Sequence, residues 1–358
     1  MNKKDRNKIE GLKGIDLFCG IGGFRIAMKQ NNIECVFSSD IDLYAQKTYF
    51  ENFGDIPEGD ITKIKASSIP SFDILTAGFP CQPFSYAGRN EGFEDKTRGT
   101  LFYDICRILK YHKPKMFLLE NVKGLKSHNK GQTLRTIEST LEKLGYNIQW
   151  KILNSYDFGL PQYRERWYCV GFLKPVYFEF PEGKKDKPTL RKIVDINENS
   201  PKLRLTDFEI ERIEHHFKNA KQVSRVQHDN SKYHPKTKKG KHGIYSFQKA
   251  DGSLRFHIGD FAKTQIQEAF YSCLDTYSST IIANRVPKLW DIKRKLSVKE
   301  AAQLQGFPKR FKFPVSDTQA YRQLGNSVSV PVIQAIIQNM LYFYSIAEKD
   351  KSRATTKV

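Results

Sequence analysis

The sequence predicts an α/β fold: a doubly wound, mostly parallel sheet with a smaller domain inserted into it. The first half of the chain alternates short apolar runs with helix-like stretches. Alternation at this spacing indicates strand–helix–strand units whose sheet is covered on both faces. A long polar and basic stretch then interrupts the alternation, and regular patterning resumes near Leu296. That interruption predicts the inserted domain.

The expected elements follow from the apolar runs in chain order. Strands are predicted at Gly14–Phe18, Cys35–Ser39, Phe72–Ala77, Met116–Leu119 and Trp167–Phe172. A further short strand is expected just before Asp60. The helices between them are predicted at Phe24–Gln30, Leu43–Asn52, Leu101–Tyr111 and Thr133–Leu144. Ligands of such sheets bind at the carboxyl ends of the strands, so we expect the functional residues there.

The alternation breaks near Pro181. Between Lys218 and Lys249 the sequence has nine Lys or Arg residues against one acid, Asp229. Helices are expected again at Val298–Gln305 and Val330–Tyr344. We therefore predict a main domain over 1–180, an inserted domain over 181–295, a hinge over 296–319, a return into the main domain over 320–347 and a polar tail over 348–358.

The net charge is +20 in 358 residues, which favours a polyanionic partner such as nucleic acid over a merely solvated lysine surface. No apolar run is long enough to span a membrane, and the basic N-terminus lacks the apolar core of a signal peptide, so a cytoplasmic protein is expected. The six cysteines form no CxxC pair. This pattern predicts reduced thiols and neither a zinc site nor a disulfide framework.

A glycine-rich turn follows the first predicted strand. It contains Asp16, Gly20, Gly22 and Gly23, and such glycines let the backbone pass close to a ligand. Asp40 follows the second strand, where a carboxylate can accept the hydroxyls of a ribose. Asp60 is expected within reach of an adenine amino group. Together these residues favour an adenosine-containing cofactor over a plain tight turn, with nicotinamide cofactors and adenosylmethionine both open.

A second group of residues carries chemistry. Cys81 follows a strand and lies between Pro80 and Pro83, which stiffen the backbone, so the thiol is either a buried packing group or an activated nucleophile. Glu120 ends the next strand and is expected to project into the same crevice rather than to cap a helix. Arg164 and Arg166 precede the last strand, and one is expected to face the site while the other makes a structural ion pair.

The motifs occur in an order that resembles a known family. The glycine turn, Gly78–Ser85, Glu120–Val122, Gln162–Arg166, Leu296–Pro308 and Gln323–Val328 are similar to the ordered motifs of bacterial C5-cytosine DNA methyltransferases of restriction–modification systems. The resemblance covers about residues 11–180 and 279–340. It implies a Rossmann-like, adenosylmethionine-dependent methyltransferase whose inserted domain recognises the DNA target.

The resemblance also implies roles for single residues. Cys81 is expected to add to carbon 6 of cytosine, Glu120 to bind ring nitrogen 3 and the exocyclic amine, and Arg164 or Arg166 to orient the base. The cofactor, S-adenosyl-L-methionine, is expected at Asp16, Phe18, Gly20, Gly22, Gly23, Asp40, Ile41, Asp60, Ile61, Phe79, Pro80, Leu101, Asn326 and Ser327. No metal is implied. The family commonly has Glu in place of Asp40 and often Trp in place of Ile41, which changes the ribose and adenine contacts.

The implied substrate is double-stranded DNA with the cytosine flipped out of the stack. Residues 85–101 are expected to form a mobile lid, with Ser85, Arg89 and Arg98 contacting DNA, and this lid is one residue longer than in some relatives. In the inserted domain, base contacts are expected from Asn230, Gln248, Arg255, Gln265 and Arg285. A monomer is expected, together with a restriction endonuclease that acts on the same sites.

Three alternatives remain from the sequence. The first is a tRNA cytosine methyltransferase on the same scaffold, although the Cys-Phe-Thr motif of those relatives is absent here. The second is a catalytically inactive DNA-binding protein, which the intact Cys81 and Glu120 disfavour. The third is a nicotinamide oxidoreductase, which would leave both residues without a purpose.

Overall fold

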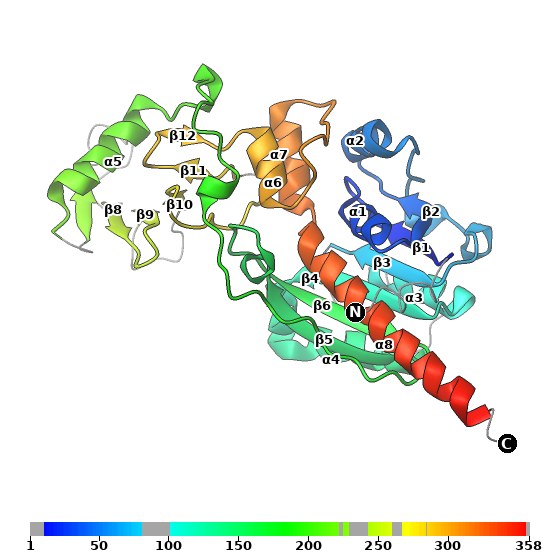
Figure 1. Cartoon of the computed structure of the whole chain (residues 1–358). Coiled ribbons are helices and arrows are strands. Elements are labelled where there is room, and N and C mark those ends of the chain that lie inside the picture. Colours follow the sequence, from blue (N-terminus) through cyan, green and yellow to red (C-terminus); the bar gives the residue numbers. More distant parts are fainter. Residues whose placement is uncertain are drawn as a thin grey trace.

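Two sheets organise the chain in the computed structural model (Figure 1). The structure describes residues 11–80, 101–221, 225–228, 243–259, 267–283 and 285–355. The larger sheet is built from the first half of the chain, and the smaller sheet falls within the predicted inserted domain. The predicted alternation of strands and helices is confirmed, while the domain boundaries themselves stay predictions.

The larger sheet has the order β2-β1-β3-β4-β6-β5. Its strands are β1 (Lys13–Leu17), β2 (Glu34–Ser39), β3 (Ile74–Gly78), β4 (Met116–Val122), β5 (Asn147–Asn154) and β6 (Glu165–Phe172). The first four pair in parallel, and β6 is antiparallel to both β4 and β5. The carboxyl ends of β1, β3 and β4 therefore meet at one edge, which the mostly parallel prediction required.

The sequence prediction missed β5 and placed an extra strand before Asp60. β5 alternates polar and apolar residues because it is an edge strand with one side toward solvent, so it contains no continuous apolar run. The segment before Asp60 forms only an isolated bridge between Ser39 and Glu58. The expected strand there is wrong.

Helices cover both faces of the larger sheet. On one face α1 (Gly23–Gln30) and α8 (Val330–Thr355) share a core with Ile74, Met116 and Leu118, and α2 (Leu43–Phe53) packs at its edge through Ala45. On the other face α3 (Leu101–His112) and α4 (Gln132–Lys143) pack on Phe117 and Leu119. Adjacent residues of β4 thus enter opposite cores, as the period of a strand buried on both faces requires.

The smaller sheet has the order β12-β11-β10-β9-β8-β7. Its strands are β7 (Val226–His228), β8 (Gly243–Gln248), β9 (Leu254–Gly259), β10 (Gln267–Ser272), β11 (Lys288–Leu289) and β12 (Arg294–Lys295). One helix, α5 (Asp207–Asn219), packs on it through Ile213, which shares a small core with Leu254 and Phe256. These elements were not predicted individually because most are short and their polar residues hide the alternation.

The chain returns to the larger sheet through three helices. They are α6 (Val298–Leu304), α7 (Asp317–Asn326) and α8. α8 continues through Thr355, so the described part of the expected polar tail over 348–358 is helical. The stretch Asp317–Lys349 is apolar and long enough to resemble a membrane span. Ile333 and Ile337 of this stretch are fully buried in the core, whereas Tyr342 and Ile346 are exposed, so part of its apolar composition belongs to the core of the larger sheet.

Short 3-10 helices complete the described chain. They are Ile61–Lys63, Ala66–Ser68, Lys123–Lys126, His128–Gly131, Ser155–Phe158, Leu190–Lys192 and Pro201–Leu203. The one at Ser155–Phe158 begins the loop that joins β5 to β6. This loop carries Arg164, and Arg166 is the second residue of β6.

Candidate active site

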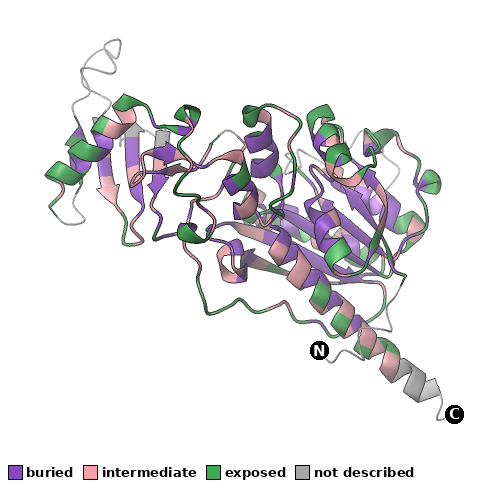
Figure 2. Ribbon diagram, turned by 45° about the horizontal axis from the view of Figure 1, so that its top comes forward, coloured by how far each residue is buried: buried purple, intermediate pink, exposed green. Residues whose placement is uncertain are grey.

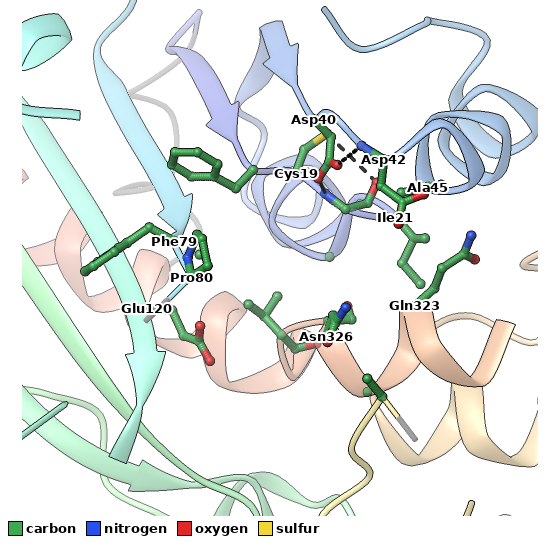
Figure 3. Close-up of a pocket in the computed structure, with 18 of the residues that line it drawn as sticks. Cys19, Ile21, Asp40, Asp42, Ala45, Phe79, Pro80, Glu120, Gln323 and Asn326 are labelled. Atoms are coloured by element: carbon green, nitrogen blue, oxygen red, sulfur yellow. Dashed lines mark hydrogen bonds between the residues drawn. The ribbon is translucent and has the colours of Figure 1, made fainter. Parts of the chain in front are cut away.

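A cavity of about 510 Å³ lies at the carboxyl ends of β1, β3 and β4. Most of the predicted site residues in the described part of the chain line it: Phe18, Gly20, Gly23, Asp40, Ile41, Phe79, Pro80, Leu101, Glu120, Arg164, Arg166, Asn326 and Ser327. Figure 3 shows Asp40 on one side of this cavity and Glu120 on the other. The fold therefore joins the two groups of residues that the sequence suggested separately.

The glycine turn enters the cavity through a strained residue. Phe18 has a φ of 56°, a left-handed conformation that costs energy for a residue with a side chain and is concentrated at functional sites. Gly20 has a φ of 53°, and a Cβ there would meet nothing, so this position is open toward the cavity. Gly22 is different, because a Cβ would lie 2.3 Å from the Phe53 ring. Its described role is packing, and it does not line the cavity.

Asp40 is fixed at the end of β2 by two backbone N–H groups. Gly20 donates to Oδ2 at 2.7 Å, and Asp42 donates to Oδ1 at 2.8 Å (Figure 3). Burial raises the pKa of this carboxyl, and the two N–H donors oppose the rise. Each oxygen keeps a lone pair, so the carboxylate can still accept hydroxyl groups from a ligand.

Three other predicted cofactor residues do not line the cavity among the residues that the structure describes. Asp16 is fully buried beneath the turn; burial, followed by the nearby Asp40, raises the pKa of its carboxyl well above the usual value. Asp60 accepts from the backbone and hydroxyl of Thr62 at the start of a 3-10 helix. Ile61 packs in the core beside α3. Direct cofactor contacts from these residues stay predictions.

Glu120 is the central titratable group of the site. It pairs in register with Gly78 of β3, where a Cβ would lie 3.6 Å from Glu120 Oε2. Arg166 Nε lies 3.3 Å from Glu120 Oε1, and both side chains are nearly buried. Burial raises the pKa of Glu120, against the smaller lowering effects of Arg166 and Arg164. A carboxyl in this environment is disposed to hold a proton and donate it in a hydrogen bond.

Asn121 connects β4 to the segment that leads to Cys81. Its amide Nδ2 donates to the carbonyl oxygen of Phe79 at 3.0 Å, and its Oδ1 accepts from the Val122 N–H at 2.8 Å. Pro80, the last described residue before Cys81, lines the cavity. Cys81, Ser85, Arg89 and Arg98 themselves lie outside the described residues.

Arg164 does not make the structural ion pair that the sequence suggested for one of the arginines. Its guanidinium is buried and donates to the carbonyl oxygens of Ile281, Gly325 and Ser327, at 2.8, 3.1 and 2.7 Å. Burial lowers its pKa to about 9, with the neighbouring Arg166 adding to the effect. Arg166 is therefore the arginine that faces Glu120, while Arg164 holds three backbone segments together.

One wall of the cavity was missed by the sequence analysis except for Gln323, which belongs to the motif Gln323–Val328. It is formed by residues of α2, of α7 and of the connection from β10 to β11: Asp42, Ala45, Ile282, Ala283, Arg322 and Gln323. That motif also contains Gly325, where a Cβ would lie 2.3 Å from the backbone nitrogen of Ala283. This close approach requires glycine, but the sequence alone does not name the partner segment.

The predicted DNA-contacting residues of the smaller sheet lie away from the cavity lining. The Arg255 guanidinium lies over the rings of Phe247 and Phe270, at 5.6 and 5.2 Å from their centroids. Arg285 also lies over the Phe270 ring, at 5.6 Å. Gln248 Nε2 lies 3.4 Å from the Gly252 carbonyl oxygen. Asn230 and Gln265 fall outside the described residues.

Neither metal ligation nor disulfide bonding is seen in the part of the chain that the structure covers. No group of three or more His, Cys, Asp or Glu residues is placed there to hold a metal ion. The described cysteines, Cys19, Cys35, Cys106, Cys169 and Cys273, are all free thiols.

Comparison with known proteins assigns the scaffold. Residues 12–342 match the model of the C-5 cytosine-specific DNA methylase family. The chain is 42% identical to the type II methyltransferase M.DsaV of Dactylococcopsis salina, over 95% of this chain and 89% of that protein. It is 43% identical to the type II methyltransferase M.HpaII of Haemophilus parainfluenzae, over 91% of this chain and 88% of that protein. It is 39% identical to the type II methyltransferase M.HhaI of Haemophilus parahaemolyticus, over 94% of this chain and 96% of that protein.

Solved structures agree on the fold. The S. pombe Dnmt2 methyltransferase superposes with a TM-score of 0.63 at 18% identity, covering 92% of this chain and 98% of that one. A Spodoptera frugiperda DNMT2 variant superposes with a TM-score of 0.65 at 19% identity, covering 93% of this chain and 100% of that one. The family matched by the sequence supports action on DNA rather than the tRNA alternative. The chain belongs to the C-5 cytosine-specific DNA methylase family and is a DNA cytosine-5 methyltransferase.

Proposed function

We propose that the chain uses S-adenosyl-L-methionine to methylate a flipped-out cytosine in duplex DNA, through a covalent bond between Cys81 and carbon 6 of the base. One observation carries the proposal. A single cavity is lined by the glycine turn and Asp40 on one side and by Pro80, Glu120 and Arg166 on the other. A methyl donor and an acceptor base can therefore meet without crossing protein.

The residues of this cavity fit the proposed donor. Gly20 leaves open space where a side chain would otherwise stand, and Asp40 offers carboxylate oxygens for a ribose. Phe18 and Ile41 provide apolar contact for an adenine ring, and Asn326 and Ser327 lie on the α7 side of the cavity. When bound, the donor supplies an electrophilic methyl group on a sulfonium. Ile41 is 72% exposed, so a ligand ring would cover it.

Glu120 and Arg166 would activate the base. Addition of a thiolate to carbon 6 moves electron density toward ring nitrogen 3, where the protonated Glu120 can donate a hydrogen bond. The raised pKa of Glu120 keeps that proton available. Arg166 holds the orientation of the carboxyl through its contact with Oε1. Carbon 5 then becomes nucleophilic enough to accept the methyl group.

Cys81 would be the nucleophile, and its expulsion would complete the cycle. After methyl transfer a base, which we take to be water, removes the proton from carbon 5, and the electrons of that bond expel the Cys81 thiolate from carbon 6. Asn121, which holds the Phe79 carbonyl, would fix the approach of the Cys81 segment to Glu120. The target atoms are inaccessible in a stacked duplex, so the base must be flipped out.

The biological setting is part of the proposal. We expect a cytoplasmic monomer that protects host DNA from an endonuclease with the same target sequence. The relatives named as type II methyltransferases support the pairing with an endonuclease. The lid residues Ser85, Arg89 and Arg98, and the arginines Arg255 and Arg285, would contact the DNA.

The reaction is tested by incubating the protein with radiolabelled S-adenosylmethionine and either unmethylated duplex DNA or tRNA. Label is expected in DNA only. Bisulfite mapping of genomic DNA from cells that express the protein should then show methylated cytosines within one short sequence. Label in tRNA alone, or no label in either nucleic acid, would reject the proposal.

Sequence choice is proposed to reside in about Lys184–Asp291, outside the motifs that carry the chemistry. Exchange of this segment for that of a relative with another specificity tests it. The chimera should methylate the sites of the donor relative. Methylation of the original sites by the chimera would overturn the assignment.

A further inference from the structure

A fully buried glutamine in the β5–β6 loop joins three segments of the chain. Gln162 Oε1 accepts from the Ile281 N–H at 2.9 Å, and Nε2 donates to the Leu304 carbonyl at 3.0 Å and to Gln305 Oε1 at 3.2 Å. Every polar atom of its amide is thus used. A buried amide satisfied on both its oxygen and its nitrogen fixes the relative positions of its partners, because losing any bond leaves a buried polar group unpaired.

The β5–β6 loop binds both the N–H and the carbonyl oxygen of Ile281. Its N–H is bound by Gln162, and its carbonyl oxygen is bound by Arg164 at 2.8 Å. The loop also pairs along its backbone with this segment, since the Tyr163 N–H donates to the Ser278 carbonyl at 2.9 Å. The connection from β10 to β11 of the smaller sheet is therefore bound against the loop that carries Arg164 and leads into Arg166 of β6.

The two residues after this clamp enter the cavity. Ile282 and Ala283 line it, and their backbone lies against Gly325 of α7. Gln305, the third partner of Gln162, also contacts the end of α7. Gln305 Nε2 donates to the Leu324 carbonyl at 2.8 Å, and Gln305 Oε1 also accepts from the Ser329 hydroxyl at 3.1 Å. Both branches of the network end at the α7–α8 turn that contains Asn326 and Ser327.

We propose that Gln162 is a positioning residue that holds the β10–β11 connection as a wall of the cavity and so couples DNA binding by the smaller sheet to binding of the methyl donor. The inference rests on the proposed function. A shift of the smaller sheet when DNA binds reaches Ile281 through the covalent chain, and Gln162 transmits it to the Asn326–Ser327 turn. By linkage, each ligand then changes the affinity for the other by the same factor.

The test uses Gln162→Met, which keeps the side-chain length and removes the hydrogen bonds of the amide. The probes are S-adenosylhomocysteine, measured by calorimetry, and a duplex fragment that the wild-type protein methylates. In the wild type, the DNA should tighten S-adenosylhomocysteine binding by about fivefold or more. In the variant this ratio should fall to about one, and the ratio, not the affinity without DNA, is the readout. Gln305→Met should show the same loss of coupling.

Tyr146→Phe is the matched control. The buried Tyr146 hydroxyl donates to the Pro114 carbonyl at 3.0 Å and lies on the α3–α4 side of the sheet, away from the cavity. The control also removes a buried hydrogen bond, and it should keep the wild-type ratio. The proposal is overturned if the wild type shows no coupling, if Gln162→Met keeps the ratio, or if Tyr146→Phe loses it equally. If no duplex is methylated at all, the proposed function itself fails.

Discussion

The two sheets of this protein differ in how they place functional side chains. The larger sheet is mostly parallel, buried between helices on both faces, and gathers its polar residues at one edge, where the strands end. The smaller sheet is mostly antiparallel, and α5 covers one face (Figure 2). Its candidate Arg255 lies within a strand, on the face opposite α5, instead of at a strand end. The first arrangement fixes a single reaction geometry, whereas the second permits variation of surface residues without disturbing the core.

Strand register defines the second arrangement. Phe247 of β8 pairs with Arg255 of β9, which pairs with Phe270 of β10. The two rings hold the guanidinium between them, and each of the three side chains is half-buried. The ring faces attract the cation and limit the rotation of the long arginine side chain. Such a held arginine is suited to donate to base edges or phosphates.

The largest effect is expected in the larger sheet from Cys81→Ala. Methyl transfer should be abolished, because no other group can add to carbon 6, while S-adenosylmethionine should still bind. Radiolabel incorporation and calorimetry measure the two quantities. A fluorocytosine-substituted duplex should form a denaturation-resistant complex with the wild type only. Residual turnover within about tenfold of the wild type would sink the covalent mechanism.

Glu120→Gln should have the next largest effect on turnover. Turnover should fall by an amount equivalent to about 3 kcal/mol or more, with little change in donor affinity. In the wild type, the raised pKa means that Glu120 holds its proton to a higher pH than usual, so kcat should decline as the pH rises through that pKa. The decline should disappear in the variant. Normal turnover combined with lost donor binding would instead assign Glu120 to the cofactor pocket.

Arg255→Ala tests the role of the smaller sheet in DNA binding. Its effect should be smaller than that of Glu120→Gln on turnover. We expect a loss of about 1–3 kcal/mol on the preferred DNA sequence, with relaxed specificity at one position. Lys249→Ala, in the turn between β8 and β9 of the same sheet, is the matched comparison. It should weaken binding to all DNA alike and flatten the salt dependence. Equal losses on every sequence for Arg255→Ala would show that the arginine contacts only phosphates.

The smallest expected effect is a loss of stability at low pH that occurs in the smaller sheet and not in the larger one. His228 and His216 share the Ser246 hydroxyl, at 2.5 and 2.6 Å, beneath α5. Burial, with smaller contributions from His215, Arg212 and His216, lowers the pKa of His228 to about 4. Because the folded value lies below the unfolded one, the stabilisation is present above about pH 6.5 and is lost as the pH falls toward about 4.

Acidification from about pH 7.5 to about pH 5.5 should therefore cost the smaller sheet about 1 kcal/mol. Hydrogen exchange should show β7–β9 losing protection before β1–β4. His228→Gln should reduce this difference, since glutamine does not titrate. An equal loss of protection in both sheets would contradict the assignment.

Much of the site was predictable because its residues follow strands. Asp40, Pro80 and Glu120 each come directly after a strong apolar run, and the carboxyl ends of parallel strands must meet at one edge. Asp60 did not follow this rule, because the segment before it forms only a bridge. Arg164 and Arg166 could not be told apart from a charged turn. Their roles depend on which one is buried among the carbonyls of Ile281, Gly325 and Ser327.

The sequence by itself determined the alternation that builds the larger sheet, the order of the motifs and hence the family, because periodicity and local motifs are properties of neighbouring residues. Only the tertiary structure decided that Ile282 and Ala283 close the cavity, that Gln162 and Arg164 clamp Ile281 and that Arg255 lies between two rings. These contacts join residues far apart in the chain, such as Gln162 and Ile281, whose numbers differ by 119. A pairing over that separation is set by how the two sheets pack, which no local pattern encodes.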